Sequence, residues 1–248
     1  MRRGRCRPAK LHHAVISGPI DVFRSPHVHG MPDVVPDRTQ RRTSAVSSIS
    51  ITNTRDGYGL IAITLHWIVA AAFIVNYALI YWTQWYVEPR TEEYFGLLST
   101  HTAIGVSVVV FVFLRVISRW MQPVPEDAPG TRLEHLGAHA VHILLYIAMF
   151  VTPLTGYFGQ GGPSQLFFAI EIPSFQNTWL FQTVIDGGLG ISWESWEGVM
   201  DYIHKTIAPW VVGLLILAHA GAALFHHVVR RDRVLIRMID PRKSSNSS

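Results

Sequence analysis

The sequence predicts an all-α membrane protein: an up-and-down bundle of four spanning helices, with a cap on the outer side and a disordered N-terminal tail. Hydrophobic residues make up 49% of the 248 residues and charged residues only 15%, against roughly 25% charged residues in a soluble globular chain. Four apolar stretches are each longer than the ~20 residues that a helix needs to cross a bilayer. They show no alternation of period two, which excludes barrel strands.

The four spans are expected in regular order along the chain. The first lies within residues 58–87, which hold no charged side chain, and the second covers residues 94–118, interrupted only by Arg115. The third runs from about 136 to 158 and the fourth from 206 to 229. This composition argues against a soluble enzyme and excludes a disordered, a collagen-like or a small disulfide-rich protein.

Three regions follow from this division of the chain. Residues 1–55 form a basic tail without sustained apolar periodicity, residues 56–240 form the bundle domain, and residues 241–248 form a polar C-terminal tail. The connection over 159–202 is long, and its glycines and aromatic residues favour a cap lying on the outer membrane surface. The single cysteine, Cys6, excludes a disulfide, an iron–sulfur cluster or a thiolate zinc site within one chain.

The distribution of basic residues predicts the orientation. Ten of the 21 Lys and Arg residues precede residue 56, and six follow Val229. By the positive-inside rule both termini are cytoplasmic. The opposite side carries only Arg90 and Lys205 as basic residues. Its acidic residues are Glu88, Glu92, Glu93, Glu171, Asp186, Glu194, Glu197 and Asp201. A nucleic-acid partner is not expected, because the Arg-rich tail lacks interleaved aromatic residues.

Histidines within the spans are the candidate functional residues, since a polar ring in hydrocarbon needs a partner. His101 and His204 lie in the outer half of the bundle, and His66 and His219 in the inner half. His204 and His219 are separated by ~22 Å along one helix and by about 60° around it. Two imidazoles facing one plane from opposite sides are what a six-coordinate haem iron needs, and such a site carries electrons without binding gas. Each histidine taken singly could instead bond a carbonyl at a helix end, and tetrahedral zinc wants three or four donors at one depth.

The remaining histidines leave alternatives open. His139 or His142, at the start of the third span, could replace His66 as the inner ligand, could hydrogen-bond a propionate or quinone, or could mark an interfacial helix end. His226 and His227 are expected to face headgroups. Arg115 could snorkel to the interface or pair with a haem propionate.

At these histidines the chain resembles the prokaryotic cytochrome b561 family, whose haem-binding design is shared by the cytochrome b subunits of some hydrogenases and formate dehydrogenases. The resemblance is carried by four segments. They are YGLIAITLHW at 58–67, HTAIGVSVVVFVFLRVISR at 101–119, HAVHILLYIAMFVTPLTGYF at 139–158 and HKTIAPWVVGLLILAHAGAALFHHVVRRDRVLIRM at 204–238.

The resemblance implies two non-covalent b-type haems in a bacterial inner membrane, one between His66 and His219 and one between His101 and His204. It also implies electron exchange with the quinone pool, with ubiquinone as a further candidate cofactor. We therefore expect a multi-pass cytochrome that moves electrons between quinone or quinol and a periplasmic redox partner, with no acid–base or nucleophilic residue.

Two alternatives stand beside this expectation. One branch of the family oxidises superoxide and reduces ubiquinone, although an acidic outer face is the opposite of the positive mouth that an anionic substrate favours. The chain could otherwise be a haem-bearing anchor subunit of a dehydrogenase or hydrogenase complex, with the acidic outer side as its docking surface.

Overall fold

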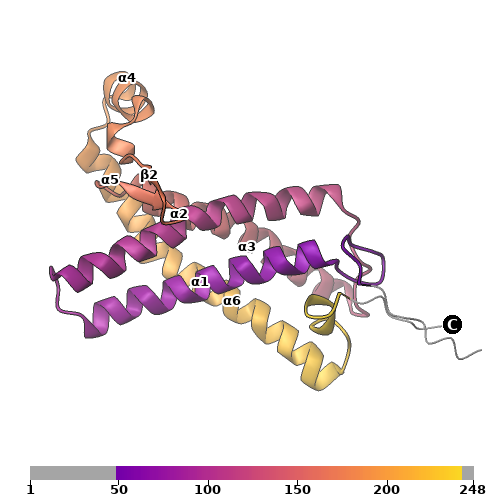
Figure 1. Cartoon of the computed structure of the whole chain (residues 1–248). Coiled ribbons are helices and arrows are strands. Elements are labelled where there is room, and N and C mark those ends of the chain that lie inside the picture. Colours follow the sequence, from indigo (N-terminus) through magenta and orange to yellow (C-terminus); the bar gives the residue numbers. More distant parts are fainter. Residues whose placement is uncertain (1–48, 242–248) are drawn as a thin grey trace, which may run out of the picture. The chain divides into compact units, whose positions relative to one another are not determined.

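The structure, a computed structural model, describes residues 49–241 (Figure 1). Most of the tails predicted over 1–55 and 241–248 lies outside the described residues. Within the described part, four helices are long and apolar enough to cross a membrane, which confirms the predicted helical bundle. They are Leu60–Tyr86, Glu92–Met121, Arg132–Phe158 and Trp193–Arg230.

The first three long helices are α1, α2 and α3, and the fourth is built from several segments in succession. The elements of the second half of the chain are β1 (Ser164–Leu166), β2 (Ile170–Ile172), η2 (Phe175–Asn177), η3 (Leu180–Asp186), α4 (Gly187–Leu189), α5 (Trp193–Asp201), η4 (Tyr202–Ile207), α6 (Ala208–Phe225), η5 (His226–Arg230) and η6 (Ile236–Met238). η3, η4 and η5 are π-helical. η4 and η5 flank α6, so the fourth long helix is widened on both sides of α6.

Local sequence signals explain where α2 and α3 begin. The Thr91 side chain accepts a hydrogen bond from the backbone of Tyr94 and caps α2. Thr131 and Glu134 form a reciprocal capping box at the start of α3. Such a cap stabilises a helix by about 1 kcal/mol. The second, third and fourth predicted spans are therefore shorter than the helices, which include the polar residues of their ends, whereas α1 lies within the range predicted for the first span.

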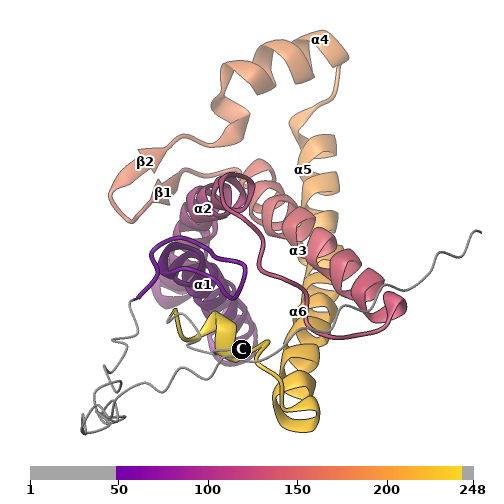
Figure 2. The same cartoon turned by 90° about the vertical axis from the view of Figure 1, so that its right-hand side faces the viewer.

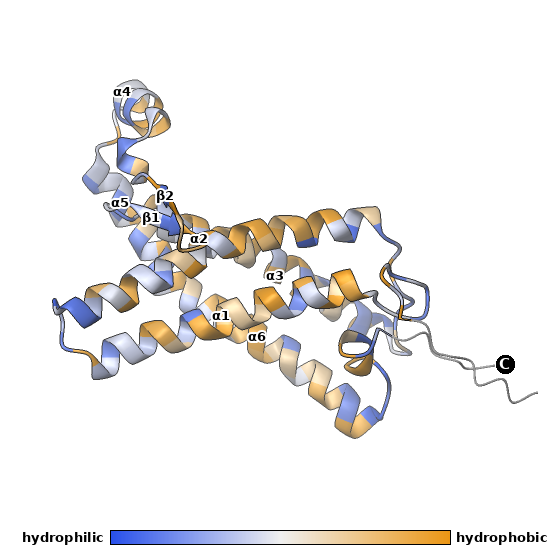
Figure 3. Ribbon diagram, viewed as in Figure 1, coloured by the Kyte–Doolittle hydropathy of each residue, from blue (hydrophilic) through white to orange (hydrophobic). Residues whose placement is uncertain are grey.

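The closest helix packing runs in chain order: α1 on α2, α2 on α3 and α3 on α6 (Figures 1 and 2). Val69, Val108 and Val112 form the buried centre of the α1–α2 contact. Only a small part of each apolar stretch is buried inside the protein. The long helices consist largely of hydrophobic residues (Figure 3), many of which are exposed, as expected for a bundle surrounded by lipid.

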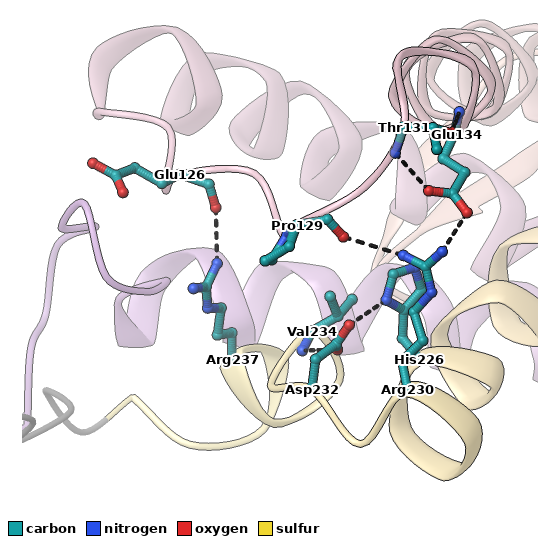
Figure 4. Close-up of polar contacts among 9 residues, drawn as sticks. All are labelled: Glu126, Pro129, Thr131, Glu134, His226, Arg230, Asp232, Val234 and Arg237. Atoms are coloured by element: carbon teal, nitrogen blue, oxygen red, sulfur yellow. Dashed lines mark hydrogen bonds and ion pairs between the residues drawn. The ribbon is translucent and has the colours of Figure 1, made fainter.

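The end of the bundle where α1 begins and α6 ends is called the proximal end here. Asn53 is buried there, and its side chain accepts from the Gly59 amide at 2.9 Å. Residues 232–241, the C-terminal strap, fold back across this end. Trp67 donates through Nε1 to the Met238 carbonyl at 2.7 Å, and Arg237 donates to the Glu126 carbonyl at 2.8 Å (Figure 4).

Residues 159–192, the cap, connect α3 to α5 at the other end. The cap has its own apolar cluster, formed by Phe175, Phe181 and Ile185, which packs against Phe158 and Trp196 of the flanking helices. The Trp196 Nε1 group donates to the Phe158 carbonyl at 3.0 Å. The long connection is therefore a folded unit fixed to α3 and α5.

Within the cap, β1 and β2 form an antiparallel hairpin in which Leu166 pairs with Ile170. Its turn contains Phe167 and Phe168 with φ values of 52° and 59°. The left-handed region costs an L-residue roughly 1–2 kcal/mol, so this turn is strained. A 2.7 Å hydrogen bond from the Phe167 amide to Ser107 Oγ holds the hairpin on α2.

Candidate haem sites

At the cap end, His101 on α2 and His204 in η4 face each other. Their ring centroids are 6.1 Å apart, with an angle of 70° between the ring planes. The Nδ1 atom of His101 is buried and has no hydrogen-bond partner among the described residues. The Nδ1 atom of His204 lies 2.8 Å from the Thr152 carbonyl. Because a carbonyl only accepts, Nδ1 of His204 carries the proton and Nε2 keeps its lone pair.

α3 is shaped to receive the His204 ring. A Cβ atom built on Gly156 would lie 2.7 Å from His204 Cε1, a separation too short for any side chain at this position. Pro153 lies in the same turn of α3, one residue after the carbonyl that His204 contacts. His204 itself occupies a π-helical turn, a geometry often found at functional sites. Glycine and the widened turn together let the ring approach α3.

At the proximal end, His66 on α1 and His219 on α6 form a second pair. Their centroids are also 6.1 Å apart, with an interplanar angle of 63°. The Trp67 ring lies edge-on to His66 at 5.3 Å. Trp67 is the residue whose indole is bonded to the C-terminal strap. The strap therefore lies next to one member of this pair.

The histidines of α3 separate into two kinds. The His142 ring lies 5.3 Å from His219, closer than His66 does. His139 is exposed, and its Nδ1 lies 2.7 Å from the His135 carbonyl of the same helix. The His135 side chain lies 3.8 Å from the Asp127 carboxylate. Of these three residues, His142 is thus the one placed beside the proximal pair.

The separation within each pair fits two ligands of one metal ion. Two imidazoles that bind a metal from opposite sides have centroids about 6 Å apart, because the metal–nitrogen bond is about 2.0–2.1 Å and each ring centre lies about 1 Å further away. His66 and His219 join α1 to α6, and His101 and His204 join α2 to η4. Neither α1 with α6 nor α2 with η4 is among the most closely packed pairs of helices. Within residues 49–241, no group of three or more His, Cys, Asp or Glu residues is placed to hold a metal.

Arg115 of α2 is a half-buried cation that interacts electrostatically with the proximal pair. Its guanidinium lies 5.9 Å from the centroid of the Tyr146 ring, and its charge acts on both His66 and His219. An arginine that is half-buried in a bundle can pair with a carboxylate in two-point fashion. The positive charge of Arg115 would therefore also act on a ligand bound between His66 and His219.

Another polar group lies at the proximal end (Figure 4). From the sequence, His226 is expected to face lipid headgroups. In the structure its Nδ1 lies 2.5 Å from the Asp232 carboxylate. Burial favours the neutral carboxyl, yet the hydrogen bonds from His226 and the Val234 amide outweigh it and lower the pKa of Asp232. Arg230 forms an ion pair with Glu134 and donates to the Pro129 carbonyl at 3.1 Å. A cavity of about 180 Å³, lined in part by His142, Glu134 and Arg230, lies beside this group.

Several residues of these sites were not singled out from the sequence. Gly156 and Thr152 shape the contact with His204, and Tyr77 links α1 to α6 through a 2.9 Å hydrogen bond to the Pro209 carbonyl. A glycine within an apolar helical stretch is the one signal that could have drawn attention to Gly156. Thr152 and Pro209 act through their backbone carbonyls, which every residue type has, so the sequence could not identify them.

Comparison with known proteins shows the relationship over most of the bundle. The chain is 30% identical over 184 residues to cytochrome b561 homolog 1 of Escherichia coli K12, covering 73% of this chain and 96% of the relative. Cytochrome b561 homolog 2 of the same strain is 29% identical over 202 residues, or 77% of this chain and 95% of the relative. A Yersinia pestis protein named "Probable superoxide oxidase CybB" is 25% identical over 191 residues, or 75% and 97%.

The family model for prokaryotic cytochrome b561 matches residues 57–241. This range contains all four long helices, the cap and both histidine pairs. A cytochrome b implies haem, and the apolar helices provide the membrane-spanning part. The chain therefore belongs to the prokaryotic cytochrome b561 family of membrane electron-transfer proteins.

Proposed function

We propose that this protein is a dihaem cytochrome that moves electrons across the bundle between the quinone pool and a periplasmic redox partner. The observation that carries the proposal is the equal 6.1 Å separation of the rings in the two pairs, His66 with His219 and His101 with His204. Bound haem supplies one-electron chemistry. The two histidines of each pair would hold one haem between them, and a haem held in this way would supply electron transfer and not oxygen binding.

The surrounding residues orient the rings and exclude water. Thr152 fixes the tautomer of His204, as the hydrogen-bonded partner of a metal ligand commonly does. Apolar helices make a dry sheath, and the C-terminal strap covers the proximal end beside Trp67. The 15 residues from His204 to His219 separate the two histidine pairs by ~22 Å along one helix.

Charge at the cap end supports a protein partner with a basic surface. Basic residues are scarce on this side, and Lys205, which follows His204, is paired with Asp201 at 2.6 Å. The positive-inside distribution supports placing this end in the periplasm of a bacterial inner membrane, with both termini in the cytoplasm. Complementary charge then accelerates encounter with a cationic redox protein and makes the rate fall with salt.

The haem content of the purified full chain tests the proposal directly. We expect two b-type haems per chain by the pyridine haemochrome assay, and one in His101→Ala or His204→Ala, with the proximal haem retained. His139→Ala is the matched control, because His139 is exposed and bonds its own helix. Retention of both haems in both cap-end variants would refute the assignment.

The proximal site requires a second comparison, because His142 lies even closer to His219 than His66 does. We expect His66→Ala to lose the proximal haem and His142→Ala to retain it. The reverse result would make His142 the ligand and leave His66 as its neighbour. Dithionite-reduced spectra of the two variants distinguish these outcomes.

Superoxide:ubiquinone oxidoreduction is a second candidate, favoured by the similarity to the Yersinia pestis protein. The ion pair between Lys205 and Asp201 weakens it, because an anionic substrate needs a positive charge near the cap-end site. Reduction of the oxidised protein by superoxide at a near-diffusional rate, with electrons recovered in ubiquinone, would support this activity. Slow reduction that does not depend on ionic strength would exclude it.

A further inference from the structure

The β1–β2 hairpin is seated on α2 at a defined depth. Ser107, which accepts the Phe167 amide at 2.7 Å, lies six residues beyond His101. This corresponds to ~9 Å along the helix from the cap-end site into the bundle. No charged residue occurs in α2 between Tyr94 and Leu114. The Phe167 ring also meets Phe111 edge-on, with centroids 5.9 Å apart.

The hairpin covers one face of α2 near Ala103 and Ser107, and the same face is exposed further toward the proximal end. Ala103 and Ser107 are buried beneath it, whereas Val110 and Leu114, on the same face of α2, are 38% and 44% exposed. In a membrane-spanning helix, such an apolar exposed face contacts lipid. Figure 2 shows the hairpin beside α2, so its tip lies at the boundary of this lipid-facing surface.

The residues of the tip are unusual for a turn in water. Phe167, Phe168 and Ile170 are 44%, 57% and 58% exposed. Turns with left-handed backbone normally use Gly, Asn or Asp. Here two phenylalanines adopt this conformation, and both remain largely exposed even though the Phe167 ring contacts Phe111. Large apolar side chains at a strained position are stabilising when their surroundings are apolar.

Two backbone amides of the tip donate hydrogen bonds within the protein, which lowers the cost of placing the tip in lipid. The Phe167 amide donates to Ser107, and the Ala169 amide donates to the Leu166 carbonyl at 3.2 Å. Glu171, the charged residue of the hairpin, lies opposite Gln165 in the antiparallel register, away from the tip. A carboxylate is costly in hydrocarbon, so we expect Glu171 to lie on the water side of the tip.

We propose that the tip of the hairpin, residues 167–170, inserts into the acyl chains of the leaflet on the cap side and anchors the cap to the bilayer surface. The anchor is apolar, because no Lys or Arg occurs between Arg132 and Lys205 to attract anionic lipid. Binding thus depends on buried apolar area and not on the charge of the lipid headgroup.

Spin labels on the full chain in nanodiscs test this inference. Cys6→Ser removes the single cysteine, and a label is then attached at Phe168→Cys, with Glu171→Cys as the matched control on the same hairpin. We expect the label at 168 to collide readily with oxygen and poorly with a water-soluble nickel chelate. The label at 171 should show the opposite preference.

Three results would overturn the inference. Equal access of the nickel chelate to both labels would place the tip in water. Exclusion of both reagents from the label at 168 would show a protein contact there, such as a second copy of the chain. The expected oxygen preference should persist in nanodiscs of purely zwitterionic lipid, and its dependence on anionic lipid would also contradict an apolar anchor.

Thermal unfolding provides an independent sign test. Phe168→Asn relieves the strain of the left-handed backbone, so it should raise the unfolding midpoint if the tip lies in water. If the tip lies in lipid, loss of the buried ring and burial of an amide should lower the midpoint in nanodiscs. We expect the lower midpoint, and an increase would count against insertion.

Discussion

Gly156 of α3 lies directly under the His204 ring, so close that a single methyl group added to Gly156 would be 2.7 Å from Cε1 and 3.1 Å from Nδ1 of the histidine. Nδ1 is also the atom bonded to the Thr152 carbonyl. One turn of α3 therefore fixes both the position and the tautomer of His204. Rotation of this ring is coupled to the backbone of a different helix.

We expect Gly156→Ala to displace His204 and impair the cap-end haem, because the added methyl group would collide with the His204 ring, and moving the ring away would strain its hydrogen bond to Thr152. The reduced spectrum should lose that haem or show a shifted potential for it. Gly137→Ala is the matched control on the same helix, since its Cβ would meet nothing within 4 Å. An unchanged cap-end haem in Gly156→Ala would contradict this view of α3.

Tyr77→Phe should loosen the contact between α1 and α6. The tyrosine hydroxyl donates to the Pro209 carbonyl at 2.9 Å, and losing one such hydrogen bond costs about 1 kcal/mol. In a chain of this size this lowers the thermal midpoint by about 2–4 °C. Tyr81→Phe, one turn further along α1, serves as the control. Equal midpoints for Tyr77→Phe and the parent protein would show that the bond contributes nothing measurable.

Arg115→Gln should lower the midpoint potential of the proximal haem. A nearby positive charge favours the state that has gained an electron, so its removal makes reduction less favourable. The charge of Arg115 acts on both His66 and His219. We expect a shift of tens of millivolts in a redox titration, with the cap-end haem unaffected. Arg132→Gln, at the exposed start of α3, is the control, and an equal shift there would argue against a local effect.

The contact between His226 and Asp232 should make stability depend on pH in acid. The pKa of Asp232 is lowered in the folded protein from an ordinary value of 3.8, so the carboxylate contributes stability above pH 3.8. This contribution is lost as the pH falls through the lower folded pKa. Asp232→Asn should therefore lower the unfolding midpoint at pH 6, and the two proteins should converge below pH 3.

Asp127→Asn is the control for this pH dependence, because Asp127 is exposed and its nearest histidine nitrogen lies 3.8 Å away. A surface pair of this kind contributes little. If the difference between Asp232→Asn and the parent protein stayed constant from pH 6 to pH 2, titration of Asp232 would not be its source.

The sequence predicts the bundle well because hydropathy alone determines which segments cross a membrane. It underestimates the helices where their ends become polar: α2 begins at Glu92, and the last helix begins at Trp193, thirteen residues before the predicted span. Favourable charges in the first turn and a serine cap extend these helices beyond the apolar stretch. A hydropathy scale contains neither the effect of charges in the first turn nor that of a capping side chain.

The four candidate histidines and their grouping by depth could also be predicted, because helical rise converts residue spacing into distance. The contact of His142 with His219 and the bond of His204 to Thr152 could not, since both depend on how α3 packs against α6. The β1–β2 hairpin could not be predicted for another reason. Its strands have three residues each, and its Phe167–Phe168 turn contains none of the residue types that usually indicate a turn.

The C-terminal strap closes the described part of the chain into a ring. The Met238 carbonyl accepts from Trp67, and the Pro241 carbonyl accepts from the Ser50 amide at 3.2 Å, so the last described residues join the first. Trp67 and Met238 are 171 positions apart in the sequence, and the four long helices lie between Ser50 and Pro241. The surroundings of His66 are therefore complete only when both ends of the described chain are in place, whereas the cap-end pair lies far from this closure.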